Sequence, residues 1–127
     1  MKKHVCVVGY GAVGPTHAAA LSKIENVILY GICDSDQERA NMGALQYNCK
    51  AFYEFEDCLK DETIDTIHIC TPHYLHYEMI VKCLKAGKEV VTEKPVTMKA
   101  EDFSDLLSHY SDKPIHVVMQ NRTNNCI

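Results

Sequence analysis

The sequence has no excess of positive charge, no long apolar run and no Cys-x-x-Cys pair. Its 13 Lys and Arg residues against 17 Asp and Glu residues give a net charge of −4, so the chain lacks the excess positive charge that attracts nucleic acid or an anionic membrane. No stretch approaches the length of a membrane span, and the apolar run near the N-terminus is too short for a signal peptide. The seven cysteines fall largely within predicted strands and helices, where a free thiol acts as a small hydrophobe. We therefore expect a reduced, cytoplasmic protein that binds neither nucleic acid nor membrane.

The 127 residues are enough for one domain with a buried core, without linkers, low-complexity segments or repeats. Short apolar, β-branched stretches alternate with stretches whose apolar residues recur at helical spacing. We expect strands over residues 4–8, 27–33, 50–53, 64–70, 89–92 and 115–119, and helices over about 15–21, 36–47, 54–60, 73–86 and 103–110. This alternation predicts an α/β domain with a doubly wound parallel sheet in the order 3-2-1-4-5-6, which binds its ligand at the carboxyl ends of the strands.

The expected helices come with particular caps and buried faces. Ser35 and Glu38 have the spacing of a capping box before the second helix, and Gly87 stands where a C-cap would end the fourth. The acidic residues between 54 and 65 are expected to form a solvated surface, and His17 to pack within its helix. The side chains expected to face the core are Ala40, Ala44 and Leu45 in the second helix, Leu75, Met79, Cys83 and Leu84 in the fourth, and Phe103, Leu106, Leu107 and Tyr110 in the last.

Gly9-Tyr10-Gly11-Ala12-Val13-Gly14 forms the pattern G-x-G-x-x-G between a predicted strand and a predicted helix. In that setting the first glycine permits a tight turn, the second lets the backbone approach a pyrophosphate, and the third lets helix and strand pack closely. The free N–H groups and the dipole of the helix start would then face the phosphates. A plain glycine turn is the alternative, and for the pattern alone it would be the better interpretation.

A second feature at the expected distance favours a dinucleotide site over a plain turn. Asp34 ends the second predicted strand, twenty residues after Gly14, where a carboxylate binds the adenosine ribose hydroxyls. Asp36 adds a second negative charge that would repel a 2′-phosphate. We therefore expect NAD to bind more tightly than NADP, although Arg39 could turn towards the phosphate instead.

Polar residues also follow the fourth, fifth and sixth predicted strands, whose carboxyl ends border the same crevice. They lie where a substrate or the nicotinamide half of a cofactor would bind. Cys70, His73 and His76 also have a spacing that suits a metal ion, but no second ligand pair accompanies them, so no metal is expected. The three segments are Thr71-Pro72-His73-Tyr74-Leu75-His76, Glu93-Lys94-Pro95 and Gln120-Asn121-Arg122.

Together these segments resemble the N-terminal domain of the glucose–fructose oxidoreductase / inositol 2-dehydrogenase (Gfo/Idh/MocA) family over essentially the whole chain. The resemblance rests on the glycine pattern with His17, on Asp34, on Thr71-Pro72 with His76, on Asn121-Arg122, and most specifically on Glu93-Lys94-Pro95. Family members move a hydride between NAD(P) and a carbon bearing a hydroxyl, mostly in sugars and polyols. The resemblance therefore implies an NAD-dependent oxidoreductase in which Lys94 is catalytic and lies beside the substrate and the nicotinamide.

The resemblance also implies a set of cofactor-binding residues, with Thr71, Pro72 and His76 lining the cofactor pocket. The family usually has Asn where this chain has His73, so the hydrogen bonds at that position differ. Plainer interpretations remain, with Lys94 as a surface lysine beside a turn proline and the two histidines as polar residues of a first helical turn. We also expect a cis Lys94–Pro95 peptide bond. The full set is Gly9, Tyr10, Gly11, Ala12, Val13, Gly14, Asp34, Thr71, Pro72, His73, His76, Glu93, Lys94 and Asn121.

The length of the chain departs most from the family, whose members have a second domain that supplies most substrate contacts and usually a catalytic His. We expect residues 1–122 to form the NAD(P)-binding domain and residues 123–127 to begin the crossover to a C-terminal α/β domain that this chain lacks. Such a half enzyme would bind NAD without turnover and form a homo-oligomer through the apolar surface left uncovered. The alternatives are a dinucleotide-binding module or sensor without chemistry, and an interaction protein that keeps the fold but not the ligand.

Overall fold

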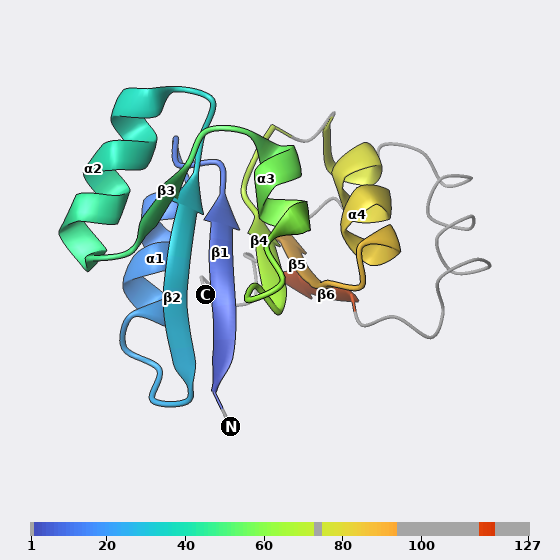
Figure 1. Cartoon of the computed structure of the whole chain (residues 1–127), viewed down its shortest axis with the longest axis horizontal. Helices are drawn as coiled ribbons and strands as arrows, with labels where there is room; N and C mark the ends of the chain where they lie inside the picture. The colour runs from blue at the N-terminus through green and yellow to red at the C-terminus, as the bar shows by residue number, and fades with distance from the viewer. Residues whose placement is uncertain (1, 73–74, 94–114, 119–127) are drawn as a thin grey trace, which may run out of the picture.

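The computed structural model describes residues 2–72, 75–93 and 115–118, and within them six parallel strands form one sheet (Figure 1). The strand order is β3-β2-β1-β4-β5-β6, as the sequence predicts. The strands are β1 (Lys3–Val8), β2 (Val27–Cys33), β3 (Lys50–Phe52), β4 (Thr66–Ile69), β5 (Glu89–Glu93) and β6 (Ile115–Val118). The helices are α1 (Gly14–Leu21), α2 (Gln37–Tyr47), α3 (Phe55–Lys60) and α4 (His76–Lys85).

Alternate side chains of β1 enter two cores, one on each face of the sheet. Val5 and Val7 pack with Ala18 and Leu21 of α1 on one face, and α2 packs beside α1 against β2 and β3. Cys6 and its alternate neighbours on β1 point to the other face, into the core that α3 and α4 complete. Figure 1 shows α1 and α2 on the left of the sheet and α3 and α4 on the right. The strand order reverses between β1 and β4, so the carboxyl ends of these strands form the switch point at which α/β sheets bind ligands.

Helix α4 follows the predicted stripe closely. Met79, Cys83 and Leu84 are buried, and Leu75, directly before the helix, is partly buried against the same core. Gly87 adopts a φ of +81°, a left-handed conformation that ends the helix as the sequence predicts. The helix therefore presents a continuous apolar face to β4 and β5.

Two expectations for α2 are wrong. Asp36, not Ser35, is the N-cap, because its Oδ1 accepts hydrogen bonds from the N–H groups of Glu38 (3.0 Å) and Arg39 (3.4 Å). Leu45 is 85% exposed, because it lies about 140° around the helix from the buried Ala40. The predicted inward positions of Ala40 and Ala44 are confirmed.

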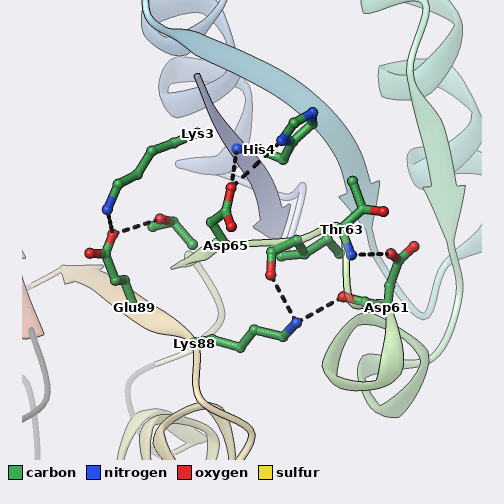
Figure 2. A network of polar contacts seen from close by, with 9 residues as sticks. Lys3, His4, Asp61, Thr63, Asp65, Lys88 and Glu89 are labelled. Atoms are coloured by element: carbon green, nitrogen blue, oxygen red, sulfur yellow. Dashed lines mark hydrogen bonds and ion pairs between the residues drawn. The ribbon is translucent and has the colours of Figure 1, made fainter. Parts of the chain in front are cut away.

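A polar network joins β1, β4, β5 and the end of α3 at the amino ends of the strands (Figure 2). Lys88 is only 6% exposed, and its Nζ donates to the carbonyl oxygens of Asp61 and Ile64, each at 2.8 Å. Glu89 pairs with Lys3 and accepts a hydrogen bond from the Thr66 hydroxyl. The network holds together the amino ends of these strands, opposite the switch point.

The acidic residues between 54 and 65 are exposed as expected, apart from the half-buried Asp61, and two of their carboxylates also accept hydrogen bonds. Asp65 Oδ2 accepts from the N–H of His4 at 2.8 Å, and Asp61 accepts from the Tyr30 hydroxyl and the Thr63 N–H, both at 2.9 Å. Burial acts to raise the pKa of Asp61, but these hydrogen bonds lower it overall. Both carboxylates thus contribute to the fold.

Some predictions fall on residues outside those described, namely the helix over 103–110 and the Lys94–Pro95 bond. In the part of the chain that the structure describes, no helix has the length and apolar character needed to cross a bilayer.

Candidate functional site

A cavity of about 800 Å³ opens at the carboxyl ends of β1, β2 and β4, where the switch point lies. The glycine loop, the turns after β2 and β4, and the loop between β3 and α3 form its walls. Segments far apart in the sequence therefore meet around one space, as the predicted crevice requires. Seven of the predicted cofactor-binding residues line it: Gly9, Gly11, Ala12, Val13, Asp34, Thr71 and Pro72.

Gly9 makes the tight turn that aims the glycine loop at the cavity. Its φ is +96°, a conformation that other residues rarely adopt. A Cβ at Gly9 would also lie 2.9 Å from the backbone of Cys70 and Thr71, so the loop packs directly against the end of β4. The Gly9 N–H donates to the Cys33 carbonyl at 2.8 Å, which ties the same loop to the end of β2.

The other two glycines of the pattern serve different purposes. A Cβ at Gly14 would clash with the Gly9 carbonyl oxygen, so this glycine permits close contact between helix and loop. A Cβ at Gly11 would have one neighbour within 4 Å, the Arg39 Nη1 at 3.5 Å, so the space above Gly11 is open. No side chain caps the start of α1, and no acidic residue lies in its first turn. The helix start can thus receive an anion approaching over Gly11.

Asp34 is fixed beside the glycine loop by backbone hydrogen bonds. Its Oδ2 accepts from the Tyr10 N–H at 2.8 Å, and its Oδ1 accepts from the Asp36 N–H at 2.9 Å. Each carboxylate oxygen has a second acceptor position, so the half-buried Asp34 can still bind a pair of hydroxyl groups. The hydrogen bond to Tyr10 also holds the loop and the carboxylate in one fixed arrangement.

The turn after β2 adds a positive charge to this wall. Arg39 is exposed, lines the cavity, and lies with its Nε 3.8 Å from Asp36 Oδ2. Ser35 lines the same wall. This wall of the cavity therefore combines the Asp34 carboxylate with the Arg39 guanidinium group, which lies beside Asp36.

The wall that follows β3 was not predicted from the sequence. Tyr53 and Phe55 line the cavity there, and Leu75 and Met79 of the α4 region line it as well. The Tyr53 hydroxyl donates to Asn41 Oδ1 of α2 at 2.6 Å, which orients its ring. These apolar groups make a surface suited to a flat ring. Their position directly after a strand of the sheet was the signal that could have found them.

Three predicted residues, Tyr10, Gly14 and His76, do not line the cavity. The Tyr10 side chain is buried, with its ring 2.9 Å from where a Cβ of Gly43 would be, although its N–H binds Asp34. His76 does not line the pocket, a correction to the expectation from the resemblance. It is fully buried where α4 packs on β4 and β5, and its Nε2 lies 2.8 Å from the Thr71 carbonyl oxygen.

No metal site accompanies the cavity in the described ranges. No group of three or more His, Cys, Asp or Glu residues there could hold a metal ion. His17 is half-buried and contacts His68, with 3.0 Å between their Nδ1 atoms. Cys33 lines the cavity, but its hydrogen bond with Cys58 and its burial raise the pKa of the thiol far above the usual range.

Comparison with known proteins assigns the chain to a family. Residues 3–120 match the oxidoreductase family Gfo/Idh/MocA, NAD-binding Rossmann fold. The chain belongs to this family.

Among proteins similar to this Gfo/Idh/MocA domain, a myo-inositol 2-dehydrogenase of Thermotoga maritima is 29% identical over 102 residues, which are 80% of this chain and 30% of that protein. A scyllo-inositol 2-dehydrogenase (NADP(+)) of Bacillus subtilis is 30% identical over 112 residues, 87% of this chain and 31% of that protein. The chain therefore spans about 30% of the length of these relatives.

Solved structures share the fold of this Gfo/Idh/MocA domain. An NAD-binding protein from Listeria innocua gives a TM-score of 0.87 at 35% identity, covering 98% of this chain and 37% of that one. A scyllo-inositol dehydrogenase from Lactobacillus casei, with bound NAD(H) and scyllo-inositol, gives 0.88 at 22% identity, covering 98% and 38%. The second likeness, at that identity, shows the fold alone.

The remaining predicted site residues lie at or beyond the limits of the described structure. Glu93 is the last residue of β5, and His73, Lys94 and Asn121 fall outside the described residues.

Proposed function

We propose that this Gfo/Idh/MocA domain binds NAD in the cavity and forms the nucleotide-binding part of a dehydrogenase of sugars or polyols. The joint placement of the glycine loop and Asp34 carries the proposal. Gly11 leaves open space beside an uncapped helix start, and Asp34 is fixed next to it by the Tyr10 N–H. A pyrophosphate and an adenosine ribose require these two features side by side.

In this proposal the two halves of the dinucleotide would lie over two parts of the sheet. The adenosine half would lie over β1, β2 and β3, with its ribose at Asp34 and its base near Tyr53 and Phe55. The nicotinamide half would lie over β4 and β5, near Thr71 and Pro72. The pyrophosphate between them would meet the start of α1.

NAD is proposed over NADP because the Asp34 carboxylate lines the cavity where the ribose would bind. The positive charge of Arg39 is engaged by Asp36 at 3.8 Å, which leaves Asp34 to repel a 2′-phosphate. The names of similar proteins include both NAD(H) and NADP, so the proposed preference for NAD rests on the residues of this chain alone.

The cofactor preference is tested by titrating the chain with NADH and with NADPH. We expect wild type to bind NADH at least about tenfold more tightly, a difference of about 1.4 kcal/mol. Asp34→Asn should remove most of that difference, because the charge that repels the 2′-phosphate is lost. Glu38→Gln, which neutralises an exposed acid in the first turn of α2, is the matched control and should leave the difference unchanged. Tighter binding of NADPH by wild type would contradict the assignment.

We further propose, from the family resemblance, that Lys94 is the catalytic residue, with His73, Glu93 and Asn121 near the nicotinamide. NAD, when bound, accepts a hydride from the carbon that bears the substrate hydroxyl. The Lys94 ammonium would donate a hydrogen bond to that oxygen and stabilise the negative charge that develops on it, while the hydroxyl proton passes to a base, in the family usually a His of the second domain. In the complete enzyme, Lys94→Ala should lower kcat far more than it weakens NAD binding, whereas Lys85→Ala at an exposed site of α4 should change neither.

The 127-residue chain alone is proposed to bind NAD without reducing it. In the family most substrate contacts come from a second domain, and positioning of the substrate contributes about 7–11 kcal/mol to lowering the barrier of such reactions. A panel of inositols and sugars tests this, and clear NADH formation by the chain alone would contradict it.

We also propose that the chain forms a homo-oligomer. Light scattering tests this, and a monomer at high concentration would count against it.

A further inference from the structure

His76 is a polar ring in an apolar core. It begins α4, is fully buried, and lies on the face of the helix that also buries Met79, Ile80 and Cys83. Burying a polar group costs free energy unless it is hydrogen-bonded, so the contacts of this ring indicate what it does there.

The ring connects two strand ends of the sheet. Its Nε2 lies 2.8 Å from the carbonyl oxygen of Thr71, in the turn after β4, and its Nδ1 lies 3.3 Å from the hydroxyl of Thr92, on β5. Because a carbonyl oxygen can only accept, Nε2 carries a hydrogen and donates it. In the neutral ring Nδ1 then accepts from the Thr92 hydroxyl. Thr92 is itself fully buried, so both groups contact each other away from water.

One connected segment, the turn after β4, lines the cavity on the side proposed for the nicotinamide half, and the other, Thr92 of β5, pairs with Ile69 at the end of β4. Thr71 lines the cavity, and the Thr71 hydroxyl is held against Met79 Sδ at 3.2 Å. Thr92 directly precedes Glu93, the last residue of β5, and Lys94 follows in the sequence. The adenosine side has its own fixation through Asp34 and Tyr10, on the other side of β1. The two halves of the site are thus held by separate contacts.

We propose that His76 is a positioning residue for the nicotinamide half of the site, acting by holding the turn after β4 to β5. This inference rests on the proposed binding of NAD. It predicts that His76 affects the part of the affinity that the nicotinamide half adds, and leaves the part supplied by the adenosine half.

The test compares two ligands, NADH and ADP, on the same variants. ADP reports the adenosine and pyrophosphate contacts, and the ratio of the two dissociation constants reports what the nicotinamide half adds. His76→Leu should weaken NADH binding at least about tenfold and leave ADP binding within about twofold. His76→Gln, whose amide can still donate to the Thr71 carbonyl, should recover most of the NADH affinity.

Two further variants separate positioning from a general loss of stability. Cys83→Ala removes a fully buried side chain from the same face of α4 and should leave the NADH-to-ADP ratio unchanged. Thr92→Val removes the hydroxyl and keeps the shape, so it should reduce NADH binding selectively even where His76→Leu fails to fold.

Equal weakening of ADP and NADH by His76→Leu and Thr92→Val would overturn the positioning role, and so would unchanged NADH binding in both. A wild-type chain that binds neither ligand would refute the proposed function itself. The two failures are therefore distinguishable.

Discussion

Lys88→Met removes a buried ammonium group and keeps a side chain of similar length. The Lys88 Nζ donates to the carbonyl oxygens of Asp61 and Ile64 at 2.8 Å each, and the residue is 6% exposed. A hydrogen bond from a charged donor contributes about 1.5–3 kcal/mol, so losing both would cost about 3–6 kcal/mol. Release of a buried charge offsets part of this cost, and we expect a net loss of about 2–4 kcal/mol in the free energy of unfolding.

Urea unfolding followed by circular dichroism measures this loss in the free energy of unfolding. In thermal unfolding of a domain of this size, Tm should fall by about 4 °C for each kcal/mol, or about 8–16 °C in total. Lys85→Met is the control, because Lys85 is exposed in the last turn of α4 and should cost less than about 0.5 kcal/mol. If Lys88→Met is as stable as Lys85→Met, the two carbonyls do not depend on Lys88 and the reasoning fails.

Two further predictions concern stability. Burial acts to raise the pKa of Asp61, but hydrogen bonds from Thr63 and Tyr30 hold it below its ordinary value of 3.8. The ionised Asp61 therefore stabilises the folded state fully above pH 3.8, and this contribution is lost as the pH falls through the lower folded-state pKa. Asp61→Asn should therefore flatten the acid limb of a profile of Tm against pH, and an unchanged limb would contradict this. Gly43→Ala would place a Cβ 2.9 Å from the Tyr10 ring and should cost about 1–3 kcal/mol in urea unfolding; a neutral result would show that the ring gives way freely.

The strand order could be predicted because its signals are local. The alternation of short β-branched stretches with helical periodicity, and the glycine pattern after β1, need no knowledge of distant contacts. The limits of β2 agree with the prediction at both ends, and Gly87 ends α4 as expected. Local signals were less decisive at the start of α2, where two neighbouring residues, Ser35 and Asp36, can both cap a helix.

The composition of the cavity walls depends on tertiary contacts that local sequence signals specify only in part. Tyr53 and Phe55 follow a strand at the edge of the sheet, and this position alone does not say that they line the cavity with residues of the glycine loop. A histidine in a first helical turn suits an exposed or a buried position equally, so only the packing of α4 on β5 decides that His76 is buried. Asp61 likewise meets Tyr30 through the pairing of distant segments.

The central claim is that the glycine loop receives a dinucleotide, and Gly11→Val tests it most directly. A Cβ at Gly11 would contact the flexible end of Arg39, at 3.5 Å, so the variant should fold like wild type while its side chain extends into the space proposed for the pyrophosphate. Ala20→Val, at an exposed position of α1, is the control. In a titration with NADH followed by fluorescence, we predict that wild type and Ala20→Val bind alike and that Gly11→Val loses at least about tenfold in affinity. Equal NADH binding by Gly11→Val and wild type would contradict the account.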